Sequence, residues 1–159
     1  MRPISSLFDF CATKNDWNNL DSDTSLLYNI SMQTNKLGII IEPNANPDSF
    51  ELKVAMLLID YFSSDIILKK SSQSYSPDLL IVKTNQLWEI KNIRGNGIHT
   101  IEHNLSRAKL QSDKIIISLY RTKMAPARAI GRIKAVFKKG TTIKQLILIT
   151  KSGKIVKIK

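Results

Sequence analysis

The feature that most constrains the fold is the succession of apolar segments after residue 48. The apolar residues there recur first with a helical period, then in three short strand-like runs, and then in alternating helical and strand-like stretches. This pattern predicts helices over 49–63, 100–112 and 125–138, and strands over 65–69, 79–84, 86–92, 114–120, 143–150 and 154–159. The order αβββαβαββ predicts an α+β domain with one mainly antiparallel sheet and flanking helices.

Local signals place the ends of these elements and the core. Asp48 or Ser49 is expected to cap the first helix and Thr100 the second, and Gly140 is expected to end the third. Because Cys11 is the single cysteine, the chain closes no internal disulfide, and the fold must rest on packing. The residues expected in the core are Trp88, Ile90, Ile115, Ile117, Leu146 and Leu148.

Charge divides the chain into two parts. Residues 1–50 carry three basic and six acidic side chains, a net charge of −3, whereas residues 51–159 carry 21 and seven, a net charge of +14. The polar first part ends in a turn-rich stretch with two prolines, which predicts an appendage over 1–45 and a basic domain over 46–159. A surface this basic indicates a polyanionic partner, with nucleic acid favoured over a membrane. No apolar run reaches the roughly 18 residues that a membrane span needs.

One group of candidate catalytic residues follows from a short motif. In the strand predicted over 86–92, alternation places Glu89 and Lys91 on one face. A Pro-Asp pair ending at Asp78 opens the neighbouring strand, and Glu51 opens the first helix. These four residues match the PD-(D/E)xK nuclease pattern, in which carboxylates hold Mg²⁺ and the lysine supports the attacking water. The simpler alternative is a cross-strand ion pair of Glu89 and Lys91 at a sheet edge.

A second group suits RNA cleavage without a metal. That reaction needs a base for the 2′-OH proton, an acid for the leaving oxygen and cations for the phosphate charge. His99 and Thr100 follow a glycine-containing loop at a predicted helix start, and Arg121 ends the next strand. Together with Lys91, these residues are expected to supply the base, the acid and the cations.

A longer stretch resembles a known family. The sequence SPDLLIVKTNQLWEIKNIRGNGIHTIEHNLSRAKLQSDKIIISLYR resembles nuclease domains of polymorphic bacterial toxins in the barnase, EndoU, colicin and RelE superfamily. That superfamily includes the tRNases of contact-dependent growth inhibition. The resemblance extends over roughly 51–159 and is most specific over 77–121. Its matched positions are Glu89, Lys91, Thr100, Gln111 and Arg121.

The cation-rich second half of the chain and the extent of the matched pattern beyond the minimal metal motif favour metal-independent acid-base transesterification, with no cofactor and no bound metal. The resemblance implies an antibacterial ribonuclease toxin that cleaves RNA, above all tRNA, with residues 1–45 as the end of an entry or linker segment. It also implies delivery from a producing bacterium, action in the cytoplasm of the target cell and a cognate acidic immunity protein, with no membrane partner for the folded domain. The expected catalytic residues are Glu89, Lys91, His99, Thr100 and Arg121. The expected RNA-binding residues are Arg94, Arg107, Lys123 and Lys151. A Mg²⁺-dependent nuclease using Glu51, Asp78, Glu89 and Lys91 and a non-catalytic nucleic-acid-binding module stay open as alternatives.

Overall fold

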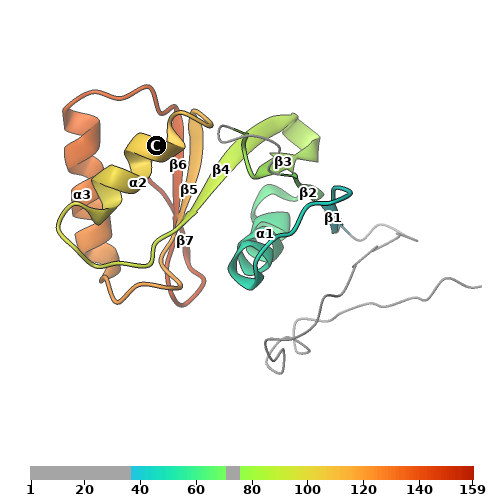
Figure 1. Ribbon diagram of the computed structural model, residues 1–159, viewed down its shortest axis with the longest axis horizontal. Helices are drawn as coiled ribbons and strands as arrows, with labels where there is room; N and C mark the ends of the chain where they lie inside the picture. Colours follow the sequence, from blue (N-terminus) through green and yellow to red (C-terminus); the bar gives the residue numbers. More distant parts are fainter. Residues whose placement is uncertain (1–36, 71–75) are drawn as a thin grey trace, which may run out of the picture. The chain divides into compact units, whose positions relative to one another are not determined.

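A seven-stranded sheet forms the centre of the folded unit, Leu37–Lys159 (Figure 1). The computed structural model describes residues 37–70 and 76–159. The strands are β1 (Ile39–Ile41), β2 (Ile66–Leu68), β3 (Leu79–Ile81), β4 (Gln86–Asn92), β5 (Lys114–Ser118), β6 (Gln145–Ile149) and β7 (Ile155–Lys157). The helices are α1 (Ser49–Phe62), α2 (Thr100–Ala108) and α3 (Pro126–Lys138), with a short 3-10 turn η2 (Val82–Thr84).

The strands follow one another across the sheet in chain order, from β1 to β7. The pairs β1 with β2, β4 with β5, and β5 with β6 are parallel, and the other three pairs are antiparallel. The predicted α+β class and the order αβββαβαββ after residue 46 are confirmed. The sheet is mixed, however, and not mainly antiparallel, because α2 and α3 are long enough to serve as crossovers that return the chain to the same end of the sheet.

Strand β1 lies before residue 46, where the basic domain is predicted to begin. Its residues Ile39 and Ile41 pair with Ile66 and Leu68 of β2, so the sheet extends into the predicted appendage. The division of the chain into two functional parts stays a prediction, and most of the predicted appendage lies outside the described residues.

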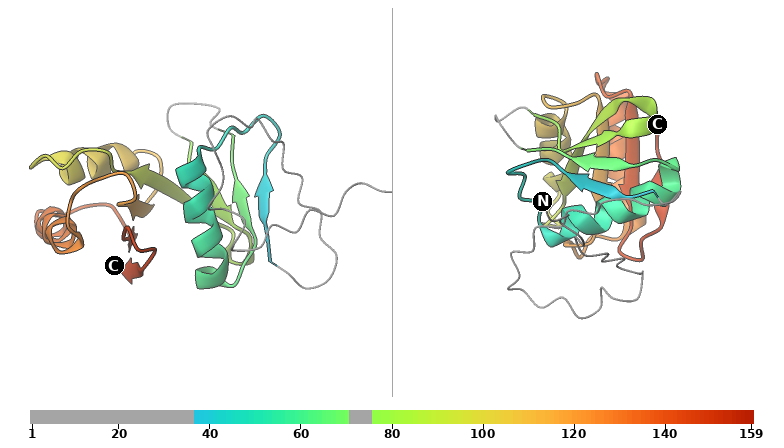
Figure 2. Two further views of the ribbon diagram at one scale, coloured as in Figure 1. Left: turned by 90° about the horizontal axis from the view of Figure 1, so that it is seen from below. Right: turned by 90° about the vertical axis from the view of Figure 1, so that its right-hand side faces the viewer.

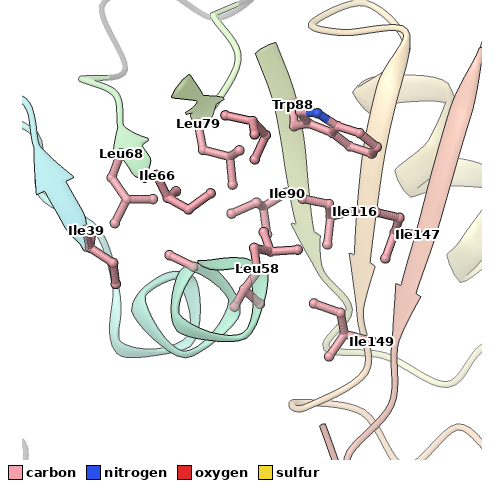
Figure 3. Close-up of a cluster of buried hydrophobic side chains, with 13 residues drawn as sticks. Ile39, Leu58, Ile66, Leu68, Leu79, Trp88, Ile90, Ile116, Ile147 and Ile149 are labelled. Carbon is pink, nitrogen blue, oxygen red and sulfur yellow. The ribbon is translucent and has the colours of Figure 1, made fainter. Parts of the chain in front are cut away.

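Helices cover both faces of the sheet (Figures 1 and 2). Helix α1 packs on one face in a core that contains Trp88, Ile90 and Ile116 (Figure 3). Helices α2 and α3 pack on the other face against Ile115 and Ile117. All six residues predicted for the core are buried, which confirms this prediction. Strands β5 and β6 are buried on both faces, and their successive residues belong in turn to the two clusters. In the described residues no helix has both the length and the apolar character needed to cross a membrane.

The helix ends follow the predicted signals in two cases out of three. The Asp48 side chain caps α1, and Gly140, with φ of 83°, follows the end of α3 in the left-handed conformation that glycine tolerates. Thr100, predicted as the cap of α2, is instead its first helical residue. His99 occupies the cap position and forms no side-chain capping hydrogen bond.

Candidate active site

Helix α1 contributes Glu51 from its first turn. The Asp48 side chain accepts hydrogen bonds from the backbone N–H groups of Phe50 at 2.9 Å and of Glu51 at 2.8 Å. In return, Oε2 of Glu51 accepts a hydrogen bond from the Asp48 N–H at 2.9 Å. This reciprocal capping box orients the Glu51 carboxyl at the start of the helix. Burial raises the pKa of Glu51, and the nearby charges of Asp48 and Asp78 add to the rise, while Lys91 opposes it.

Strand β4 contributes Glu89 and Lys91. Glu89 is fully buried, and its Oε1 forms an ion pair with Nζ of Lys91. The same Nζ donates a hydrogen bond to Oε1 of Gln111 at 2.8 Å, and Nε2 of Gln111 donates to the Ser76 carbonyl at 3.4 Å. The ion pair therefore joins two residues of one strand in the middle of the sheet. The expectation of a cross-strand pair at a sheet edge is wrong, because β4 has strands on both sides.

Asp78 lies beside Glu89 at the start of β3. Its Oδ2 accepts a hydrogen bond from the backbone N–H of Ile90 at 2.8 Å. Burial raises the pKa of Asp78, and the Ile90 hydrogen bond opposes this rise. Burial also raises the pKa of Glu89 to about 8, with the negative charge of Asp78 adding to it and the Lys91 ammonium opposing it. This pKa favours the protonated form of Glu89 at neutral pH, as for one of two adjacent buried carboxyls that cannot both ionise. In that form the contact with Lys91 is a hydrogen bond from the ammonium to a neutral carboxyl, and it becomes an ion pair when Glu89 ionises.

The carboxyls of Glu51, Asp78 and Glu89 are the candidate ligands for a metal ion. Among residues 37–70 and 76–159, no three Asp, Glu, His or Cys side chains are arranged to hold a metal ion, and Glu51 is engaged by its capping box. Asp78 and Glu89 remain as two neighbouring oxygen donors of the kind that Mg²⁺ uses. Within the same residues, Oε2 of Glu89 is buried and accepts no hydrogen bond, while the protonated Glu89 carboxyl forms a hydrogen bond with Asp78. A two-carboxylate cation site thus fits this arrangement.

The residues expected for metal-independent cleavage are not gathered at one point. His99 and Thr100 lie at the start of α2, whereas the Lys91 ammonium contacts Gln111, three residues after α2 ends. The nine residues of α2 extend over about 13 Å, so the two groups lie at opposite ends of the helix. Arg121 lies at the start of α1 instead, with NH1 3.3 Å from Oδ2 of Asp48.

Three of the four predicted RNA-binding residues form a basic edge of the sheet at the carboxyl ends of the parallel strands β4, β5 and β6. Arg94, Lys123 and Lys151 are exposed and follow β4, β5 and β6, respectively. Because these three strands are parallel, the loops after them lie at the same edge. Arg107 is also exposed, but it lies in the last turn of α2, away from the edge at which that helix begins.

Two residues have a larger part in the site than the sequence indicated. Gln111 belongs to the matched positions of the resemblance but was not among the expected catalytic residues, although it holds Lys91 in place. Asp48 was expected to be a helix cap, and it also pairs with Arg121, whose guanidinium lies 4.6 Å from the centre of the Phe50 ring. No local signal connects Asp48 and Arg121, which lie 73 positions apart.

Comparison with known proteins identifies the family. Residues 75–155, just over half of the chain, match the family described as the contact-dependent growth inhibition CdiA C-terminal domain. The chain belongs to this family. CdiA C-terminal domains are antibacterial toxins that pass from producing cells to target cells, which confirms the resemblance to toxins of contact-dependent growth inhibition.

The structure of this CdiA C-terminal domain is similar to a solved structure, the CdiA-CT/CdiI toxin and immunity complex from Burkholderia pseudomallei. The TM-score is 0.57 with 18% sequence identity, and the similarity covers 77% of this chain and 98% of the other. At this identity the similarity shows a shared fold. No curated protein matches the chain.

Proposed function

We propose that this CdiA C-terminal domain is a nuclease that hydrolyses phosphodiester bonds in the target cell. Its proposed site consists of Glu51, Asp78, Glu89 and Lys91. The observation that carries the proposal is the pair of carboxyls formed by Asp78 and the fully buried Glu89, which are in hydrogen-bond contact with each other beside the Lys91 ammonium. Burying such a group costs free energy, and strongly perturbed carboxyls of this kind concentrate at functional sites.

Each residue of the proposed site would have a different role in the reaction. Asp78 and Glu89 would hold a divalent cation, which when bound supplies Lewis-acid stabilisation of the phosphate charge and favours ionisation of the attacking water. Glu89 must first give up the proton that its pKa of about 8 retains at neutral pH. Lys91, held by Gln111, is placed to stabilise negative charge as it develops on the phosphate. Glu51 adds negative charge at the rim of the site.

This proposal favours the metal-dependent alternative over the metal-independent route and revises the expectation that no cation takes part. The length of α2 between Thr100 and the Lys91 ammonium supports this choice, because acid, base and cation must reach one phosphate together. His99 is exposed and lies at the Thr100 end of that helix.

The substrate class follows from charge and from the resemblance. The exposed basic residues Arg94, Lys123 and Lys151 at one sheet edge suit the phosphates of a nucleic acid. The resemblance to tRNases makes tRNA the substrate to test first. A domain that binds RNA and cleaves nothing is the competing outcome.

Cleavage of total bacterial RNA and of duplex DNA, with Mg²⁺ or with EDTA, tests the proposal. We expect discrete tRNA fragments with Mg²⁺, none with EDTA, and loss of at least 100-fold in rate for Asp78→Asn. Asp60→Asn is the matched control, because Asp60 is exposed in the last turn of the same helix that presents Glu51. Fragments with 2′,3′-cyclic phosphate ends in EDTA would instead support the metal-independent route. Intact RNA that shifts in a gel would support the binding module.

We also propose a cognate acidic immunity protein that covers the basic edge. The solved structure with the similar fold is a toxin and immunity complex, and the net charge of +14 over residues 51–159 favours an acidic partner. Association should slow with increasing salt, because opposite charges steer the encounter. If a cell without the neighbouring immunity gene tolerates expression of the chain, the proposed toxicity is wrong.

A further inference from the structure

A small pocket lies at the end of α1 remote from Glu51. It has a volume of about 130 Å³. Its walls come from the last turn of α1 and from strands β4, β6 and β7, and its lining residues are Tyr61, Phe62, Gln86, Trp88, Gln145, Ile147, Lys157 and Lys159. Glu51 and Tyr61 are ten residues apart on α1, so the pocket lies about 15 Å from the candidate active site along the helix.

Trp88, one of the lining residues, has a buried indole N–H group. The side chain is only 2% exposed, and its Nε1 is buried without a hydrogen-bond partner in the described part of the chain. Buried indole N–H groups normally find an acceptor, since leaving one unpaired costs about 1 to 3 kcal/mol. Figure 3 shows the indole ring extending from β4 toward Ile116 and Ile147. The indole is nearly covered by its neighbours, so the exposed ring of Tyr61 is the aromatic surface that a ligand in the pocket would meet first.

Aromatic side chains and carboxamides form other parts of the pocket wall. Phe62 packs beside Trp88, with ring centroids 5.5 Å apart, and Tyr61 meets Phe62 edge to face at 4.9 Å. The half-buried Gln86 and Gln145 bring carboxamides, which offer both donors and acceptors. Aromatic surface combined with such polar groups suits a planar heterocycle with polar edges.

Two lysines add positive charge at the pocket. Nζ of Lys159 is engaged, because it donates a hydrogen bond to the Ile143 carbonyl at 2.8 Å and lies 5.0 Å from the centre of the Phe137 ring. Lys157 is exposed and forms no ion pair with any described residue. An ammonium group beside an aromatic and amide-lined pocket suits a phosphate attached to the heterocycle.

We propose that this pocket binds one unpaired nucleobase, with Lys157 contacting the phosphate of the same nucleotide. Its volume is well below the roughly 300 Å³ at which ligand pockets usually begin, so it suits a single base and excludes a base pair. Stacking on aromatic side chains is the usual way in which proteins bind unpaired bases, at about 1 to 3 kcal/mol per base. The inference deepens the proposed nuclease function, because a nucleotide held here would position a strand that extends toward the active site.

Nucleotide titration of the full chain, followed by tryptophan fluorescence, tests the pocket. The chain has two tryptophans, so Trp17→Phe leaves Trp88 as the reporter. Each of the four 5′-monophosphates and the corresponding nucleosides would be added without divalent cations. We expect saturable quenching by at least one base, and Gln145→Leu should weaken binding of its nucleoside and nucleotide at least fivefold. Absence of saturable quenching, or equal affinity in Gln145→Leu, would overturn the proposal.

Lys157→Glu tests the phosphate contact. It should weaken binding of the monophosphate at least fivefold and leave binding of the nucleoside unchanged. The matched control is Lys134→Glu, the same charge change at an exposed position in the middle of α3, which should alter affinity less than twofold. Equal effects of the two substitutions would refute a direct contact between Lys157 and phosphate.

A second arm separates the two sources of nucleotide. If Gln145→Leu weakens binding of a single-stranded oligonucleotide and of a mononucleotide alike, the pocket holds a base of the substrate strand. If it weakens binding of the mononucleotide alone, the pocket takes a free nucleotide. If it weakens neither, the inference is wrong. Nucleotide binding without cleavage would refute the proposed nuclease activity alone, and cleavage without nucleotide binding would refute the pocket alone.

Discussion

The protonated state of Glu89 leads to a quantitative prediction about stability. The pKa of this carboxyl rises from 4.5 to about 8 on folding. Between these two pH values the folded chain binds more protons at Glu89 than the unfolded chain does. The free energy of unfolding should therefore fall as the pH rises from about 4.5 to about 8 and stay level above that.

The size of the effect follows from the shift. At about 1.4 kcal/mol per pH unit, a rise from 4.5 to about 8 corresponds to at most about 5 kcal/mol. Relaxation of the protein and penetration of water reduce the cost of a buried charge, so we expect the contribution of Glu89 to lower the free energy of unfolding by about 2 to 5 kcal/mol over this pH range. Glu89→Gln keeps the shape of the side chain and an acceptor for Lys91 but cannot ionise. This variant should lose the part of the slope that Glu89 contributes, while the raised pKa values of Glu51 and Asp78 keep a smaller slope, and it should be more stable than the wild type at pH 9.

Urea denaturation of the full chain from pH 5 to pH 9, followed by the fluorescence of the buried Trp88, measures this difference. Trp17→Phe in every variant keeps the signal from Trp88 alone. Asp60→Asn, which removes an exposed carboxyl, should keep the wild-type slope. If the wild type and Glu89→Gln lose stability in parallel, within about 0.5 kcal/mol across this range, the reasoning about Glu89 is refuted.

Four further predictions concern the cation, the helix cap, the third helix and salt. Mg²⁺ or Mn²⁺ should bind more tightly at pH 8.5 than at pH 6.5, and its binding should release protons. Calorimetry in buffers of different ionisation enthalpy measures the number of protons released, and Glu89→Gln should abolish this release. Asp48→Ala should cost about 0.5 to 2 kcal/mol of unfolding free energy, and Asp48→Asn, which can still cap, should cost less. Gly140→Ala should destabilise the protein by about 1 kcal/mol, because the φ of Gly140 is 83°. Gly131→Ala should stabilise it by about 0.5 to 1 kcal/mol, because Gly131 lies in the middle of α3 with open space around it. Thermal unfolding measures both effects. The logarithm of the RNA association constant, measured by anisotropy, should fall steeply and linearly with the logarithm of salt concentration, and a flat dependence would contradict the proposed binding of phosphates at the basic edge.

Much of the secondary structure could be predicted because it is encoded locally. The alternation in QLWEIKN predicted β4 over the residues at which the structure places it, and it placed Trp88 and Ile90 in the core. The cap of α1 at Asp48 follows from the position of a short polar side chain before a helical apolar pattern. Helix α2 is shorter than predicted, ending at Ala108, because the backbone N–H groups of Leu110 and Gln111 bond three residues back in tighter turns.

The parallel pairings and the composition of the site depend on contacts between distant segments. The spacing of Asp78 and Glu89 indicated a possible carboxylate pair, but the pKa of Glu89 depends on how completely the folded sheet removes it from water. The contact of Arg121 with Asp48 arises because β5 ends beside the start of α1. The same sequence also allowed a second catalytic set around His99, and only the length and direction of α2 separate that set from Lys91.

The sequence by itself determined the helices and strands, the basic character of the domain and the residue types that make up the proposed phosphodiester-cleaving site. These properties depend on side-chain periodicity and on charge, which act between neighbours or over the whole surface. The tertiary structure decided which of these residues meet, which carboxyl keeps its proton and where Trp88 presents an unpaired N–H. Those properties depend on burial and on distances across the sheet, which exist only after the chain has folded.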